Sequence, residues 1–215
     1  MQRVWYIAYG SNLALERFRC YLSGGRPAGG MREYAGCRDP RDPDRIVSLD
    51  VPGGLIFAGR SGTWGGGMAF YDAHAPGRAA CRAYLVTTDQ FADITAQEMR
   101  RAPGGGYARH LAGLLPDVES VHTTGTGRYE TVTRLGVRNG TPMFTVTHDD
   151  LAGLELTAPT ASYLRWICAG LREAHGWDQG RIASYLADAP GISGSWTHDE
   201  IAALARTDGF DLPAR

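Results

Sequence analysis

A short segment near the amino terminus has the composition of a loop that could hold an anion. Its sequence is Tyr9-Gly10-Ser11-Asn12-Leu13. The glycine ends a short apolar run that predicts a buried strand, and a helical pattern follows the loop. Glycine lets the backbone turn sharply, so that the next amides point outward at the positive end of the helix. Such a loop can bind a carboxylate. The alternative is an ordinary strand-to-helix turn in which Ser11 or Asn12 caps the helix.

Glu98 is the second candidate, because helical periodicity places its carboxyl with the apolar side of a predicted helix. It lies seven residues after Phe91 and four after Ile94, while polar residues gather on the other, solvated side of the helix: Gln90, Asp93 and Gln97. Burial of an unpaired carboxylate costs free energy or raises its pKa, which tunes a general acid or base toward neutral pH. The alternative is that the last helical turn frays into solvent, or that Glu98 pairs with Arg100, Arg101 or Arg109.

Other patterns of catalytic and metal-binding residues do not occur in the sequence. There is no G-x-S-x-G, G-x-x-x-x-G-K-[ST] or H-E-x-x-H motif, and no G-x-G-x-x-G motif follows a strand. The six histidines form no helical pair, and the four cysteines lack C-x-x-C spacing. We therefore expect no metal site and no cofactor. All 22 basic residues are arginine, which excludes chemistry based on a lysine side chain.

The elements that would position these two features follow from periodicity and turn residues. Short apolar runs separated by turn residues favour an antiparallel sheet or small barrel, with strands at 4–9, 46–49, 55–58, 68–71 and 83–86. Thr87 and Gln90 form a capping-box pattern, which predicts a helix that ends near Met99. We expect Asn12 to cap the helix that follows the first strand.

The second half of the chain predicts a hairpin and three helices. Residues 100–126 are rich in glycine and are expected to form loops. Strands are expected at 129–137 and 143–147, joined by Asn139-Gly140, and helices at 160–174, from Asp178 to Pro190, and after the capping box at 197–200.

Length and charge limit the broad class of protein. The 215 residues fit a single domain at 1–215, with a core at about 3–190 and a C-terminal helical extension at about 191–215. The net charge is −1 and no apolar stretch has the length of a membrane span, so we expect neither nucleic acid nor membrane as a partner. The first apolar run is too short for a signal peptide, so a cytoplasmic location is expected. The sequence predicts no particular oligomeric state.

The loop and the glutamate together resemble the γ-glutamylcyclotransferase-like family. In that family a Y-G-S-N-[LM] loop directly follows the first strand, and a glutamate closes a later helix, as Glu98 does here. Residues 61–67 resemble the family's glycine-rich turn, and residues 163–186 resemble its carboxy-terminal helix pair. The resemblance covers about 4–98 and 159–187. The chain departs from the family after Glu98, where Met99-Arg100-Arg101 replaces the common continuation.

The resemblance implies an α+β fold with a small mixed or antiparallel β-barrel, flanked by helices and followed by extra C-terminal helices. It also implies a metal-independent γ-glutamyl cyclotransferase without a cofactor, which releases an amine or amino acid from a small γ-glutamyl substrate and forms 5-oxoproline. In this interpretation Glu98 is the catalytic acid and base. The residues that bind the substrate are Tyr9, Gly10, Ser11, Asn12 and Leu13.

Two other functions fit the same residues. The chain could be a non-catalytic protein that binds a small ligand on the same fold, with Glu98 in a structural role. It could also be a metal-independent amidohydrolase in which Glu98 activates water. The sequence leaves the identity of the released amine open.

Overall fold

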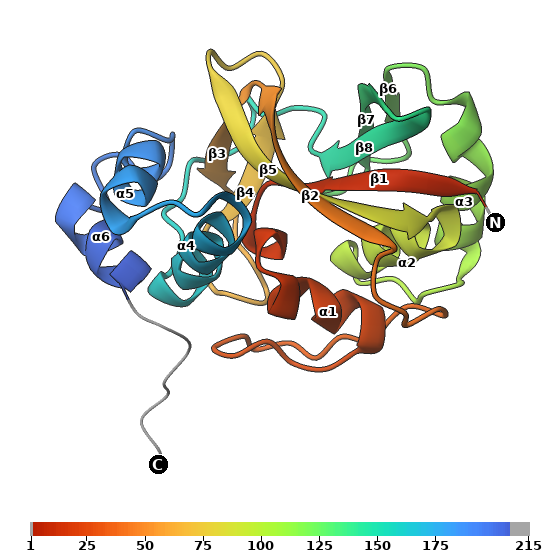
Figure 1. Ribbon diagram of the computed structural model, residues 1–215, viewed down its shortest axis with the longest axis horizontal. Helices are drawn as coiled ribbons and strands as arrows, with labels where there is room; N and C mark the ends of the chain where they lie inside the picture. Colours follow the sequence, from red (N-terminus) through yellow and green to blue (C-terminus); the bar gives the residue numbers. More distant parts are fainter. Residues whose placement is uncertain (1, 207–215) are drawn as a thin grey trace.

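A six-stranded mixed sheet lies at the centre of the computed structural model, which describes residues 2–206 (Figure 1). The strand order is β2-β5-β1-β8-β7-β6, and only β1 and β8 are parallel. The strands are β1 (Arg3–Ala8), β2 (Arg45–Pro52), β5 (Arg78–Thr87), β6 (Val121–Thr123), β7 (Thr131–Arg138) and β8 (Thr141–Thr147). A separate hairpin pairs β3 (Gly54–Ala58) with β4 (Met68–Asp72). No hydrogen-bonded strand pair among the described residues joins the two edge strands, β2 and β6.

Helices cover both faces of this mixed sheet, and the fold is therefore of the α+β type. They are α1 (Leu15–Ser23), α2 (Thr88–Glu98), α3 (Gly106–Leu114), α4 (Ala161–His175), α5 (Gln179–Ala187) and α6 (His198–Arg206). Two short 3-10 turns, η1 (Ser11–Leu13) and η2 (Leu115–Asp117), precede α1 and follow α3. In Figure 1, α4, α5 and α6 gather at one end of the molecule, and α2 and α3 lie at the other end.

Side chains of β1 alternate between two apolar clusters, because successive residues of a strand point to opposite faces. Trp5 and Ile7 belong to the cluster that includes residues of α4, α5 and α6. Val4 and Tyr6 belong to the cluster that includes residues of α1, α2 and α3. The central strand is therefore buried on both faces, as its continuous apolar sequence predicts.

Three predicted helix ends are confirmed at the level of single hydrogen bonds. Thr87 Oγ1 accepts a hydrogen bond from Gln90 N at 3.0 Å, and Thr87 N donates to Gln90 Oε1 at 3.0 Å. Helix α4 stops at Gly176, whose φ of 65° lies in the left-handed region that favours glycine. Asp178 then caps α5 by accepting a hydrogen bond from Arg181 N at 2.8 Å.

Other local expectations were wrong. Ala14, and not Asn12, is the N-cap of α1, because residues 11–13 form η1 before the helix begins. Helix α3 and strand β6 lie in the region that we expected to be loop. The polar side of α2 is not solvated: Asp93 and Gln97 are each 1% exposed, because the segment at 36–41 covers them.

The carboxy-terminal helix packs against the helices before it. Ile201 and Ala205 of α6 are buried in the same apolar cluster as residues of α4 and α5. The expected extension at 191–215 therefore includes an ordered helix, while residues 207–215 lie outside the described residues. No helix in the described part of the chain combines the length and the apolar character that crossing a membrane requires.

Candidate active site

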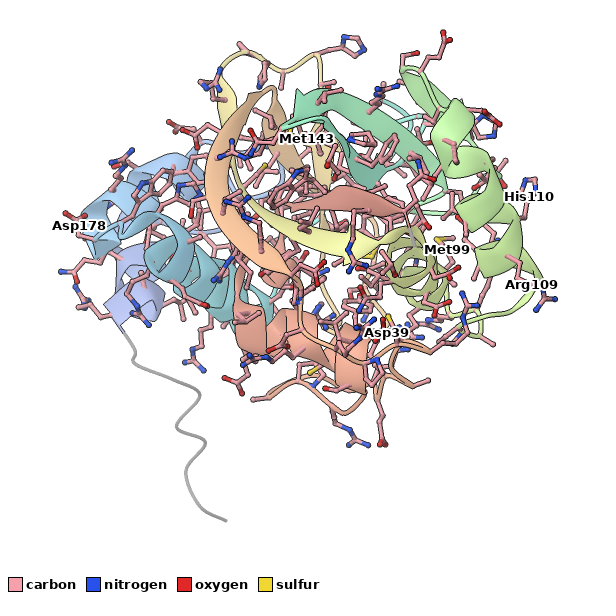
Figure 2. All side chains as sticks on the ribbon, turned by 45° about the vertical axis from the view of Figure 1, so that its right-hand side comes forward. Asp39, Met99, Arg109, His110, Met143 and Asp178 are labelled. Carbon is pink, nitrogen blue, oxygen red and sulfur yellow. The ribbon has the colours of Figure 1, made fainter. Side chains whose placement is uncertain are left out.

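A pocket opens where the end of β1, the turn η1 and the end of α2 meet. It holds about 630 Å³ of empty space, including the part that is open to solvent. Tyr9, Gly10, Ser11, Asn12 and Glu98 all line it, so the loop and the glutamate of the sequence analysis face one cavity. In Figure 2 the residue after Glu98, Met99, is labelled at the end of α2.

The loop is shaped by the close approach of Gly10 to another wall of the pocket. A Cβ on Gly10 would lie 3.1 Å from Tyr163 Oη and 3.5 Å from Ala69 Cβ, so the site leaves little room for a side chain. Ser11 and Asn12 follow at the pocket surface. Leu13, the last residue of the predicted loop, has a side chain that is 0% exposed and packs in the apolar core, outside the pocket lining.

Glu98 and Asn12 lie side by side in the pocket. Asn12 Nδ2 donates to Glu98 Oε1 at 3.5 Å and to Tyr6 Oη at 3.0 Å. The amide oxygen of Asn12 is buried and accepts no hydrogen bond within the described residues. The pocket therefore presents the Glu98 carboxylate, which is an acceptor that suits a cationic hydrogen-bond donor.

The pKa of Glu98 is raised above its ordinary value by burial. The guanidinium of Arg17, a hydrogen bond with Tyr21 and the charge of Arg32 act in the opposite direction and lower the pKa of Glu98. Within residues 2–206, Glu98 forms no ion pair with Arg100, Arg101 or Arg109: Arg101 pairs with Glu130 at 2.6 Å, and Arg109 donates to the carbonyl of Gly104.

Arg17 is a pocket residue that sequence reasoning missed. Its side chain is buried between aromatic rings, with the guanidinium carbon 4.5 Å from the centroid of Tyr21 and 4.6 Å from that of Tyr34. Arg17 Nη2 donates to Tyr34 Oη at 2.8 Å, while Nε and Nη1 have no acceptor among the described residues. The available signal was the spacing of four between Arg17 and Tyr21, which places both on one side of α1.

Aromatic side chains form most of the pocket wall. Trp64 and six tyrosines contribute to it: Tyr6, Tyr9, Tyr21, Tyr34, Tyr129 and Tyr163. Several hydroxyls are held by the backbone, since Tyr9 donates to the Val146 carbonyl at 2.7 Å and Tyr129 to the Ala69 carbonyl at 2.8 Å. Burial raises the pKa of Tyr163 to about 12, so this phenol stays neutral at physiological pH.

The glycine-rich segment at 61–67 brings Thr63 and Trp64 to the pocket. Ser61 Oγ accepts hydrogen bonds from Thr63 N at 3.1 Å and from Trp64 N at 3.0 Å, which closes a tight turn. A Cβ on Gly67 would lie 1.9 Å from the Thr157 carbonyl oxygen, so glycine is needed where the segment before α4 passes.

The end of α2 is fixed by polar contacts that hold Glu98 in position. The Gln97 side chain accepts from Gly36 N at 3.0 Å and donates to the Tyr21 carbonyl at 2.9 Å. Asp93 accepts from Arg38 N at 3.0 Å and from Gly104 N at 2.7 Å. These side chains tie α2 to segments on both sides of it. Within residues 2–206, no group of three or more His, Cys, Asp or Glu side chains could hold a metal ion.

Comparisons with known proteins show the fold. A solved structure titled "Gamma-glutamyl cyclotransferase" matches with a TM-score of 0.50 and 17% identity, over 95% of this chain and 98% of that chain. A human protein whose structure is titled "uncharacterized" matches with a TM-score of 0.46 and 17% identity, over 96% of this chain and 100% of that chain. The first similarity shows that the chain shares the fold of a γ-glutamyl cyclotransferase.

Sequence comparisons assign no family. No family model matches the chain. Histone deacetylase 5 of Arabidopsis thaliana is 35% identical over 99 residues, which cover 44% of this chain and 15% of that protein. The match thus spans only 15% of the length of this curated relative.

Proposed function

We propose that the protein is a metal-independent γ-glutamyl cyclotransferase, which releases an amine or amino acid from a small γ-glutamyl compound and forms 5-oxoproline. The shared fold supports the proposal, but one fold can host many functions. The observation that carries it is the pairing of Glu98 with Asn12 in the pocket that the Tyr9–Asn12 loop borders.

The γ-glutamyl group has an α-ammonium and an α-carboxylate, and the pocket offers a partner for each. The α-ammonium would donate to Glu98, which Asn12 holds in place through its amide nitrogen. The amides of Gly10, Ser11 and Asn12 would hold the carboxylate or the oxyanion that develops during the reaction. In acyl-transfer enzymes, the loss of one such donor costs about 2.7–4 kcal/mol.

The proposed reaction needs no nucleophile from the protein. Glu98 takes a proton from the α-ammonium, and the free amine nitrogen then attacks the γ-carbonyl carbon to form the ring C–N bond. The C–N bond to the leaving amine breaks as Glu98 delivers the proton to the leaving nitrogen. Glu98 passes on a second proton from the ring nitrogen in the same way. The lactam thus keeps one N–H, the amine leaves as an ammonium ion, and no water is consumed.

The protein supplies orientation and proton transfer in this scheme. Well-oriented intramolecular attack can lower the barrier by about 7–11 kcal/mol, and the aromatic wall of the pocket would hold the reactive rotamer. A carboxyl with a raised pKa is a better match for an amine than an ordinary glutamate is. A positioned acid or base of this kind contributes about 10²–10⁴-fold to the rate.

The proposal is tested by incubating the protein with γ-glutamyl dipeptides and analysing the products by mass spectrometry. We expect 5-oxoproline and the free amino acid in equal amounts. Free glutamate would indicate an amidohydrolase, and the absence of turnover would indicate a binding protein. Glu98→Gln should lower kcat by about 10²–10⁴-fold. Glu16→Gln is the matched control, because Glu16 is exposed on α1 and does not line the pocket.

A further inference from the structure

The charges that line the pocket are unbalanced. Glu98 is its one carboxylate, whereas four arginines line it: Arg17, Arg32, Arg100 and Arg128. The net charge of the lining is therefore about +3 when Glu98 is ionised. The whole chain carries −1, so the positive charge is concentrated at this cavity. None of the four arginines forms an ion pair with an Asp or Glu of residues 2–206.

The four arginines come from different segments and extend from the buried end of the pocket to its opening. Arg17 is 2% exposed, Arg32 and Arg128 are partly exposed, and Arg100 is exposed. Arg32 Nη1 donates to the Gln97 carbonyl at 2.9 Å, next to Glu98. Arg128 Nη1 lies 3.5 Å from Met68 Sδ, in the strand β4 on another wall. A ligand would therefore meet cationic groups along its whole path.

Arg100 occupies a backbone conformation that favours glycine. Its φ is 57°, at the point where α2 has ended, and helices commonly place glycine in this left-handed conformation. Its guanidinium lies against Gly62, where an added Cβ would come within 1.4 Å of Arg100 Nη2. The chain thus keeps a strained arginine where glycine would be free of strain, and it leaves space for the side chain on the 61–67 segment.

On the basis of the cyclotransferase function proposed above, we propose that the pocket selects γ-glutamyl compounds whose released amine carries two or more acid groups. The γ-glutamyl group contains one ammonium and one carboxylate, so it cannot neutralise the pocket. An amine with one carboxylate neutralises a single arginine, whereas an amine with two acid groups can also engage the arginines at the opening. A cavity with low-dielectric walls and one sign of charge concentrates ligands of the opposite charge. A cationic leaving group, such as a polyamine, is repelled.

Two dipeptides that differ by a single charge test this selection. γ-Glutamyl-glutamate and γ-glutamyl-glutamine have nearly the same shape, but the second replaces the side-chain carboxylate with an amide. We expect kcat/KM to favour γ-glutamyl-glutamate by about tenfold, the factor that one charge-assisted hydrogen bond contributes. The preference should shrink as the salt concentration rises, because salt screens charges near the surface. Equal kcat/KM values would overturn the selection.

Substitutions of single arginines identify the residues that are responsible for the preference for γ-glutamyl-glutamate. Arg128→Gln and Arg100→Gly should each reduce the preference toward about twofold, and Arg100→Gly should leave Tm unchanged or raised because glycine relieves the backbone strain. Arg109→Gln is the matched control, since Arg109 lies on the outer side of α3, where Figure 2 labels it, and should keep the full preference. A preference that survives the loss of Arg100 and Arg128 would contradict the assignment.

The outcomes separate this proposal from the proposed function. If 5-oxoproline forms from both dipeptides at equal rates, the cyclotransferase function stands and the selection fails. If neither dipeptide is turned over, the cyclotransferase function fails, and calorimetric titration of the wild-type protein with both dipeptides tests the charge selection alone. We expect γ-glutamyl-glutamate to bind about tenfold more tightly. Equal affinities, or binding of neither, would overturn the selection.

Discussion

Gly10→Ala probes the shape of the loop, and its effect should depend on a hydroxyl group in the opposite wall. The new methyl group would lie 3.1 Å from Tyr163 Oη, closer than the usual contact distance. Tyr163 cannot retreat easily, because its ring packs on Trp64 with centroids 5.5 Å apart and its hydroxyl accepts from Ala69 N at 3.2 Å. The φ of Gly10 is −106° and its ψ is −141°, which lies outside the α and β regions that alanine prefers.

Two effects of opposite sign decide the stability of this variant. Replacing glycine with alanine stabilises a protein by about 0.4–1 kcal/mol through the unfolded state, where the backbone conformation allows it. Overpacking a buried contact destabilises by about 1–3 kcal/mol. We expect a net loss of about 1 kcal/mol, which for a chain of this size lowers Tm by about 2–4 °C. Because the displaced loop carries Ser11 and Asn12, kcat/KM should fall as well.

Tyr163→Phe provides the second arm of a double-mutant cycle, since it removes the oxygen that the new methyl group approaches. In the Tyr163→Phe background, Gly10→Ala should cost less stability than in the wild type, because the close contact with the hydroxyl is gone and only the backbone conformation opposes the change. Urea unfolding of the four proteins measures the coupling. If Gly10→Ala has the same cost in both backgrounds, the loop does not rest against Tyr163 and our account of its shape is wrong.

Three further changes test the chemistry of the pocket. Burial raises the folded-state pKa of Glu98 above 4.5, so the free energy of unfolding should fall as pH rises through that raised pKa and the carboxyl ionises. Glu98→Gln cannot ionise at this position and should not show this loss of stability. Urea unfolding at about pH 4 and about pH 7 checks this, and a variant less stable than wild type at the higher pH would contradict it. Chelation of metal ions should leave turnover unchanged, whereas a chelator-sensitive rate restored by added metal would refute metal independence. Ser11→Ala should lower kcat/KM by about tenfold, because it removes about one hydrogen bond to the substrate. Steady-state kinetics measure this loss. A loss as large as that of Glu98→Gln would instead indicate a nucleophilic serine.

Much of the fold could be predicted because it depends on local patterns. The capping box at Thr87 and Gln90 is readable from two residues, and it sets the start of the helix that carries Glu98. The glycine at 176 and the aspartate at 178 are equally local signals. Helix α3 was missed because it begins at the glycine-rich stretch before Tyr107 and buries only Ala108 and Leu111, which is a weak periodic signal.

The prediction of the site was partial for a different physical reason. The position of Glu98 on the apolar side of α2 follows from periodicity alone, and the pocket contains it. The burial of Asp93 and Gln97 could not be predicted, because the segment that covers them comes from a distant part of the chain. Arg17 was missed because an arginine on an amphipathic helix usually faces solvent. Its aromatic surroundings come from α1 and from two loops that only the fold brings together.

The most direct test of the central claim is to follow the nitrogen and oxygen atoms of the substrate. A γ-glutamyl dipeptide labelled with ¹⁵N at the α-amine is incubated with the protein in H₂¹⁸O, and the products are analysed by mass spectrometry. Cyclisation by the substrate's own amine predicts 5-oxoproline that carries ¹⁵N in its ring and no ¹⁸O, formed by the wild type and not by Glu98→Gln. Glutamate with one ¹⁸O atom in its γ-carboxylate would show that water is the nucleophile and would contradict the account.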